Sequence, residues 1–97
     1  MPYTYILRCR DGSYYVGSTW DLDRRLAEHQ AGEGAEYTKH RLPVELVYCS
    51  ESESIRDAYA WEKRIQGWGR RKRAALIRGD FDALPGLASR LWRPPAG

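Results

Sequence analysis

The chain has 97 residues and a formal net charge of +3, and this length supports one domain with one core. No stretch approaches the roughly 20 apolar residues of a membrane helix, and residues 1–5 lack the regions of a secretory signal, so we expect a cytoplasmic protein without membrane contact. Two cysteines and two histidines at unrelated spacings fit no zinc pattern, and the glycine-rich motifs of nucleotide-binding loops are absent.

Aromatic side chains make up for a scarcity of aliphatic ones. Leu, Ile, Val and Phe total only 17 residues, a level that is typical of disordered chains. Seven Tyr and four Trp supply the missing apolar area, because each aromatic side chain buries a large surface. We therefore expect a folded domain with an aromatic-rich core or face, in which Cys9 and Cys49 are reduced, buried thiols.

The chain begins with a predicted hairpin. Residues 3–9 and 13–19 are rich in aromatic and β-branched types and predict two strands, joined by a turn at residues 10–12. The turn decides which side chains of the two strands share a face of the sheet.

Two turns are compatible with these residues. A two-residue turn at positions 11 and 12 puts Tyr5 and Tyr15 on opposite faces of the hairpin. A three-residue loop with Gly12 in the left-handed conformation puts both tyrosines on one face and sets Tyr5 opposite Gly17. If the tyrosines act together, the three-residue loop is required, and Gly17 then leaves space for a ligand to approach.

The rest of the chain alternates helical and extended segments. Asp21 and Ser54 are N-cap residues, and Gly67 and Gly79 end helices. In chain order, we predict a helix over residues 21–31, a loop over 35–43, a strand over 44–49, and helices over 55–66 and 70–78. Three short strands with helices between and after them predict an α+β fold with a small sheet, mixed or antiparallel.

The helix over residues 55–66 carries a carboxylate on its apolar side. Successive residues rotate by about 100°, so Glu62 falls within an apolar stripe, while Lys63 and Arg64 point away. A buried carboxylate is costly unless it is paired or binds a metal ion, so Glu62 is either the partner of an Arg or a catalytic or metal-binding group. The stripe consists of Ile55, Ala58, Tyr59 and Ile65, with Trp61 at its edge.

The helix over residues 21–31 repeats this pattern. Leu22 and Leu26 define its apolar face, and Arg25 and His29, four residues apart, flank that face. Two adjacent cations repel each other, so this pair suits an anion such as phosphate. The equally weighted structural interpretation is an Arg that lies over the sheet edge beside a neutral core His.

These residues are also the pattern of a known family. Several blocks, in order along the chain, resemble the GIY-YIG nuclease domain of certain homing endonucleases, some restriction enzymes and the nucleotide-excision-repair incision subunit. The stretch from Tyr3 to about Ile77 is similar to the small stand-alone bacterial branch of this superfamily. The residues that carry the resemblance are Tyr3-Thr4-Tyr5, Tyr15-Val16-Gly17, Arg25 with His29, and Glu62.

The sequence departs from the family pattern at two places. The first motif keeps only its final tyrosine, Tyr5, and many family nucleases have an Asn after the glutamate helix. Here the corresponding region is Gly67-Trp68-Gly69-Arg70, and the chain contains no asparagine. This departure concerns one supporting catalytic contact rather than the centre of the site.

The resemblance implies a GIY-YIG-like fold, a three-stranded antiparallel sheet with flanking helices, which hydrolyses nucleic-acid phosphodiesters with one divalent metal ion. Glu62 would hold Mg²⁺ or Mn²⁺ at a single site, and Arg25 would bind the scissile phosphate. Tyr5 or Tyr15 would orient or deprotonate the attacking water, and we favour Tyr5 as the base. His29 would contact the second tyrosine or the phosphate.

A tyrosine base needs cationic help, because the unperturbed pKa of its hydroxyl is about 10. The metal ion, Arg25 or a neighbour such as Lys39 or His40 would supply it. Basic side chains also concentrate beside Glu62: residues 62–78 hold seven basic groups and one acidic group, whereas residues 1–49 hold six and seven. The predicted nucleic-acid contacts are Lys39, His40, Lys63, Arg70, Arg71, Lys72 and Arg73.

Two hypotheses follow from the sequence. The first is a metal-dependent endonuclease that acts on nucleic acid, preferably DNA, with low intrinsic sequence specificity and a protein partner that supplies specificity. The alternative is a catalytically silent nucleic-acid-binding or protein-interaction module on the same fold. We assign residues 1–79 to the domain and residues 80–97 to a C-terminal tail, partly docked and Pro-rich at its end.

Overall fold

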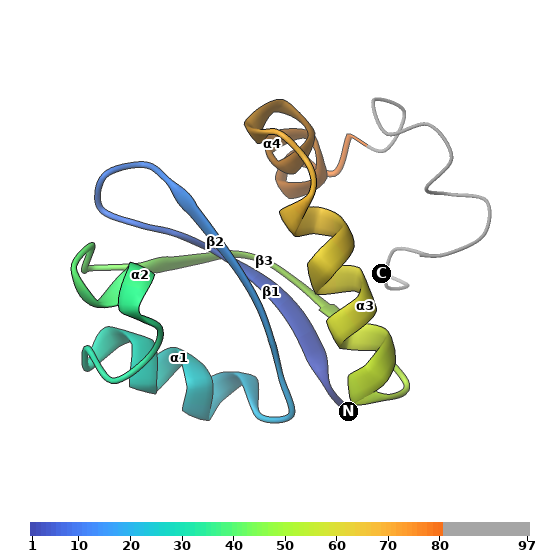
Figure 1. Ribbon diagram of the computed structural model, residues 1–97, viewed down its shortest axis with the longest axis horizontal. Helices are drawn as coiled ribbons and strands as arrows, with labels where there is room; N and C mark the ends of the chain where they lie inside the picture. The colour runs from blue at the N-terminus through green and yellow to red at the C-terminus, as the bar shows by residue number, and fades with distance from the viewer. Residues whose placement is uncertain (81–97) are drawn as a thin grey trace.

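A three-stranded antiparallel sheet lies between two groups of helices in the computed structural model, which describes residues 1–80 (Figure 1). The strand order is β2–β1–β3, so β1 is central and β2 and β3 are edges. The predicted docking of the tail lies outside the described residues. The elements are β1 (Tyr3–Arg8), β2 (Tyr14–Thr19), α1 (Leu22–Gln30), α2 (Glu36–Lys39), β3 (Glu45–Glu51), α3 (Ile55–Gln66) and α4 (Arg70–Arg78).

The hairpin uses the three-residue loop. The N–H of Cys9 donates to the carbonyl of Ser13 at 2.8 Å, and Gly12 has φ 85°, a left-handed value that glycine adopts without strain. The register places Tyr5 opposite Gly17. Side chains alternate along a strand, so Tyr5 and Tyr15 share one face of the sheet.

Polar caps set the helix boundaries as the sequence predicts. The side chain of Asp21 accepts from the N–H of Arg24 at the start of α1, and that of Ser54 accepts from the N–H of Asp57 at the start of α3. The predicted loop over residues 35–43 contains one helical turn, α2. This turn has no side-chain N-cap, and four residues are too few to show helical periodicity, so the sequence signals did not predict it.

Each face of the sheet has its own apolar cluster. The cluster under α3 and α4 contains Ile6, Val16, Trp61, Ile65, Ala75 and Leu76, and the cluster under α1 contains Tyr5, Leu7, Cys9 and Val44. A register shift between Ile6 and Leu7 in the β1–β3 pairing leaves Val47 unpaired as a bulge, so it packs on the α3 side together with its neighbour Tyr48.

Two residues that we expect to be buried, Tyr59 and Cys49, are exposed. Tyr59 is 53% exposed, because it lies beside the apolar stripe of α3, where the Lys63 ammonium covers its ring at 4.8 Å. Cys9 is buried as predicted, but Cys49 is exposed on the edge strand β3; both are free thiols. None of the helices within residues 1–80 has the length and apolar character needed to cross a membrane.

Candidate active site

The hydroxyl of Tyr5 lies over β2. The ring is almost completely buried, at 2% exposure, and it crosses from β1 to the place where residue 17 would carry a side chain. A Cβ at Gly17 would lie 2.5 Å from the Tyr5 hydroxyl oxygen. The space at Gly17 therefore holds the tyrosine of this chain, and the expectation that it admits a ligand is wrong.

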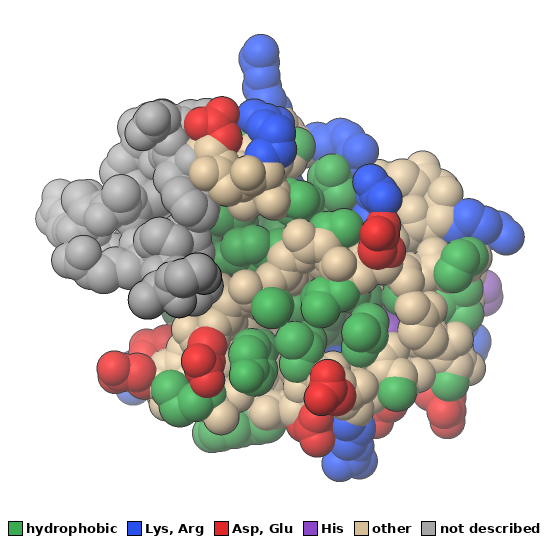
Figure 2. Space-filling model, turned by 180° about the vertical axis from the view of Figure 1, so that it is seen from behind, with side chains coloured by type: hydrophobic (Ala, Val, Ile, Leu, Met, Phe, Trp, Pro, Cys, Tyr) green, Lys and Arg blue, Asp and Glu red, His purple; other side chains and the backbone are tan. Residues whose placement is uncertain are grey.

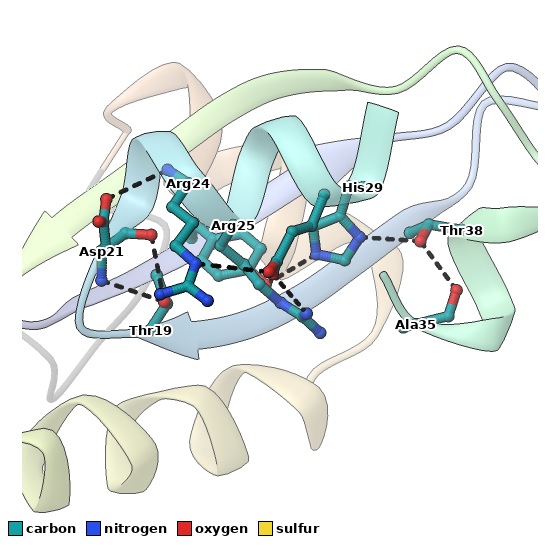
Figure 3. A network of polar contacts seen from close by, with 9 residues as sticks. Thr19, Asp21, Arg24, Arg25, His29, Ala35 and Thr38 are labelled. Carbon is teal, nitrogen blue, oxygen red and sulfur yellow. Dashed lines mark hydrogen bonds and ion pairs between the residues drawn. The ribbon is translucent and has the colours of Figure 1, made fainter. Parts of the chain in front are cut away.

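His29 joins this hydroxyl to α2. The imidazole is fully buried, with Nε2 2.9 Å from the Tyr5 hydroxyl and Nδ1 2.9 Å from the hydroxyl oxygen of Thr38. Figure 3 shows His29 between α1 and Thr38, whose hydroxyl donates to the carbonyl of Ala35 at 3.0 Å. Burial, together with the charge of Arg25, lowers the pKa of His29 to about 4, so the imidazole is neutral.

The Thr38 hydroxyl assigns the tautomer of this neutral imidazole. A hydroxyl has one proton, and that of Thr38 is donated to Ala35, so its oxygen accepts from Nδ1 of His29. Nε2 then carries a lone pair and accepts from the hydroxyl of Tyr5. The chain of hydrogen bonds thus leads from Tyr5 through His29 to Thr38.

Tyr15 forms the outer wall of this cluster. Its ring centroid is 6.4 Å from that of Tyr5 and 5.3 Å from that of His29. Its other neighbour is the ring of Tyr37, stacked at 6.2 Å, which the Arg41 guanidinium covers at 3.9 Å. This stack holds Tyr15 between the buried cluster and the surface.

Arg25 lies one turn before His29 on α1 and is half-buried. Burial raises the pKa of Tyr5 to about 12, and the Arg25 guanidinium acts in the opposite direction. The Nη1 atom of Arg25 is 3.1 Å from Oε1 of Glu28, and the guanidinium of Arg24 lies 3.6 Å from the other oxygen of the same carboxylate. In this structure the Glu28 carboxylate is thus paired with the guanidinium that we expect to bind phosphate.

Glu62 approaches the same strand from α3. The residue is 8% exposed, and its carboxylate accepts from the hydroxyl of Ser18 at 2.6 Å and from the amide of Gln66 at 2.8 Å, while the Lys63 ammonium lies 3.5 Å away. Within residues 1–80 it has no ion pair with an Arg, so the predicted Glu–Arg alternative is wrong. Gln66 also donates to the carbonyl of Val16 at 3.2 Å, which ties Glu62 to the edge strand β2.

The donor set around Glu62 fits one hard cation. A carboxylate offers about four lone-pair positions, and the contacts with Ser18, Gln66 and Lys63 leave some of them free. The described residues contain no group of three or more His, Cys, Asp or Glu that could hold a metal ion. A cation at Glu62 would thus have few protein ligands, which is the coordination that Mg²⁺ accepts because it keeps several waters.

The site therefore spans the outer edge of β2. Tyr5, Tyr15, Arg25 and His29 come from the α1 side, and Glu62 comes from the α3 side. Ser18, which donates to Glu62, directly follows Gly17, where a Cβ would lie 2.5 Å from the Tyr5 hydroxyl oxygen, so both groups approach the same part of β2. A cavity of about 360 Å³ opens beside them, lined in part by Ser18, Arg25 and Glu28.

The predicted nucleic-acid contacts divide into two groups. Lys39 and His40 are exposed on and after α2, and both pair with Glu36 rather than with a tyrosine. The remaining residues lie on α3 and α4, and Figure 2 shows Lys and Arg side chains along the margin of the molecule where α4 lies. Lys63, Arg70, Arg71 and Lys72 are exposed.

Two of these arginines have structural contacts. Arg73 donates to the carbonyls of Ile65 and Gln66 at the end of α3, so its guanidinium caps that helix. Arg70 donates to the carbonyl of Gly12 and covers the ring of Tyr14 at 4.4 Å, which fixes α4 against the hairpin.

Four positions of the site were not predicted from the sequence. Thr38 and Gly34 contact His29, and a Cβ at Gly34 would overlap its imidazole. Ser18 and Gln66 hold the carboxylate of Glu62. Gln66 has a detectable signal, because a residue four positions after Glu62 lies on the same helix face.

Comparisons with known proteins agree with this architecture. A family model described as the GIY-YIG catalytic domain matches residues 1–74. UPF0213 protein BH0048 from Halalkalibacterium halodurans is 44% identical over 75 residues, which cover 77% of this chain and 80% of the relative. UPF0213 protein VNG_2274C from Halobacterium salinarum is 43% identical over 77 residues, which cover 79% of this chain and 100% of the relative.

A solved structure is similar in both sequence and fold. The solution NMR structure of the UPF0213 protein BH0048 from Bacillus halodurans has a TM-score of 0.53 and 43% identity to this chain. The match covers 80% of this chain and 84% of that structure. The family model, the relatives and the antiparallel sheet with its flanking helices agree, and the chain belongs to the GIY-YIG family.

Proposed function

We propose that this protein is a metal-dependent endonuclease that hydrolyses phosphodiester bonds in nucleic acid, preferably DNA. The observation that carries the proposal is the meeting of two tyrosines, an arginine, a histidine and a carboxylate at one strand edge beside an open cavity. Metal-assisted phosphodiester hydrolysis uses a route for the proton of the attacking water, a cation for the phosphate and an anchor for a divalent ion. In this cluster Tyr5 and His29 would take the proton, Arg25 would bind the phosphate and Glu62 would hold the divalent ion.

Glu62 is the residue that would hold the divalent ion. When bound there, Mg²⁺ or Mn²⁺ supplies positive charge to the phosphate and to the leaving oxygen. Ser18 and Gln66 orient the carboxylate through the hydrogen bonds that they donate. Gln66 thus brings to Glu62 a side-chain amide, the group that is missing at the Asn position of the family pattern.

Arg25 would bind the scissile phosphate through its guanidinium. The fork of an Arg matches two phosphate oxygens, and burial strengthens such a bond. Glu28, whose carboxylate is 3.1 Å from Nη1 of Arg25, already occupies one part of this fork. Glu28 therefore competes with the substrate for the same donor.

Tyr5 and His29 would carry the proton of the attacking water. One proton passes from water to the Tyr5 oxygen as the Tyr5 proton passes to Nε2 of His29; the water oxygen bonds to phosphorus, and the leaving oxygen departs and takes a proton from solvent. With pKa values of about 12 for Tyr5 and about 4 for His29, the isolated transfer costs on the order of 10 kcal/mol. We therefore expect the proton transfer to occur together with bond formation to phosphorus rather than before it.

A cleavage assay tests this function. Supercoiled plasmid, single-stranded DNA and structured RNA are incubated with the purified protein in Mg²⁺, in Mn²⁺ and in chelator. We expect cleavage that requires the metal ion, prefers DNA and is lost in Glu62→Gln, because the amide removes the charge that holds the cation. Glu53→Gln, which changes an exposed carboxylate outside the cluster, is the matched control and keeps wild-type activity.

Two outcomes would contradict the proposal. Cleavage that survives chelation or Glu62→Gln excludes a catalytic cation at this residue. A protein that binds nucleic acid, loses binding when Arg71 and Lys72 are neutralised, and never cleaves is instead the silent binding module.

A further inference from the structure

Trp20 presents a large apolar surface at the mouth of the cavity. It follows β2 directly, and its side chain is 63% exposed, the largest value among the aromatic residues of the described part. Other exposed aromatic rings have neighbours: Tyr37 lies between Tyr15 and Arg41, and Tyr59 lies under Lys63. Within residues 1–80, Trp20 has no ring or cation contact of this kind. An indole so placed is available to a ligand.

The cavity that Trp20 lines also contains a residue of the candidate site. Its volume of about 360 Å³ is within the range of small-molecule sites in proteins. The lining includes the apolar side chains of Trp20 and Ile55, which begins α3, and it includes Arg25, the residue beside the Tyr5 hydroxyl. A base held against Trp20 and a phosphate held by Arg25 would therefore share one cavity.

The charges of the cavity favour a base over a free anion. Arg24 and Arg25 are opposed by Glu28, which pairs with both, and by Asp21, whose carboxylate caps α1. Two cations and two anions leave no excess charge to attract an isolated phosphate. A phosphate that belongs to a nucleotide can gain affinity from the base of that nucleotide. When the base stacks on an aromatic side chain, the stacking is worth about 1–3 kcal/mol per base.

We infer that Trp20 and the cavity form a nucleobase subsite that holds an unpaired base next to the phosphate at Arg25. This inference rests on the proposed function and specifies its substrate. In a continuous duplex both faces of each base are covered by neighbouring bases, so an indole reaches only an unstacked or terminal one. The preferred substrate is therefore nucleic acid with unpaired bases, such as a single strand, a flap or a bulge.

Binding in chelator tests the subsite separately from cleavage. Fluorescence anisotropy compares the affinity of the full chain for a labelled single-stranded oligonucleotide, an abasic strand of the same length and a blunt duplex. We expect Trp20→Ala to weaken binding of the single strand about tenfold and to leave the abasic strand and the duplex unchanged. Trp20→Phe retains most of the affinity, and Tyr59→Ala, which removes another exposed ring, has no effect.

The outcomes separate this inference from the proposed function. If Trp20→Ala weakens all three ligands equally, or none, or if Tyr59→Ala has the same effect on the single strand, there is no base subsite at Trp20. Cleavage by the wild type that Trp20→Ala leaves unchanged on a single strand and on a duplex contradicts the subsite while the nuclease function stands. Single-strand binding that depends on Trp20 in a protein without cleavage supports the subsite and contradicts the nuclease function.

Discussion

At the scale of single residues, the site depends on two glycines as much as on its polar side chains, because glycine has no Cβ. Gly17 and Gly34 leave space for the ring of Tyr5 and for the imidazole of His29. The sequence identified Tyr5 and His29 as candidates from their positions on apolar faces and from the family resemblance. Their contact was not predictable from spacing, because it depends on the Gly12 turn and on Thr38, which is nine residues from His29.

Gly17→Ala tests the first of these spaces. A methyl group at this position would lie 2.5 Å from the Tyr5 hydroxyl oxygen, so the ring must move away from His29. We expect a loss of roughly 1–3 kcal/mol in the free energy of unfolding, measured by urea denaturation, and a loss of any cleavage activity. Gly69→Ala is the matched control, because a Cβ at Gly69 has no neighbour within 4 Å. Equal effects of the two substitutions would contradict this packing.

The buried His29 makes stability depend on pH. Its pKa is about 4 in the folded protein and about 6.5 in the unfolded chain, so between these values only the unfolded chain binds the proton. The contribution of His29 to stability is complete above pH 6.5 and is lost as the pH falls through 4, by at most about 3 kcal/mol. Urea denaturation over this range measures the slope.

A control and a direct measurement accompany this prediction. His40→Gln removes the exposed histidine and should keep the slope. An NMR titration that finds the pKa of His29 near 6.5 would contradict the buried, neutral state.

At the scale of the elements, capping residues, terminating glycines and hydrophobic period were sufficient to predict the three helices α1, α3 and α4 and all three strands. They were insufficient where tertiary contacts decide: α2 is a single turn, Val47 forms a bulge, and Tyr59 turns outward beside the buried stripe of α3. Helix α1 carries three groups of the site within two turns, namely Arg25, Glu28 and His29. The ion pair between Arg25 and Glu28 forms within this helix.

Glu28→Gln tests whether this carboxylate competes with phosphate. The substitution removes the anion that holds Arg24 and Arg25, so both guanidinium groups become available to nucleic acid. We expect affinity for a single-stranded oligonucleotide to rise several-fold at low salt and the dependence of affinity on salt to become steeper. Glu33→Gln, an exposed change in the loop after α1, controls for net charge. An equal rise in both variants would show an effect of net charge alone.

At the scale of the whole molecule, the candidate site draws on both faces of the sheet. The cluster under α1 continues into Tyr5 and His29 at the edge of β2, and α3, which packs on the other face, contributes Glu62. Exposed cations on α3 and α4 lie on the side of Glu62, which was predictable from the charge distribution along the chain. The contacts of Arg73 with the end of α3 were not predictable, because charge alone does not distinguish a helix cap from a phosphate contact.

The most direct measurement of the proposed mechanism compares two tyrosines on opposite faces of the sheet, the buried Tyr5 and the partly buried Tyr48. Burial raises the pKa of both Tyr5 and Tyr48 to about 12, but only Tyr5 contacts His29. The rate of DNA cleavage in Mg²⁺ is measured for Tyr5→Phe and Tyr48→Phe. We expect Tyr5→Phe to lower the rate by about 10²–10⁴-fold and Tyr48→Phe to leave it within a few-fold of the wild type. A Tyr5→Phe variant that cleaves as fast as Tyr48→Phe would contradict the proposed mechanism.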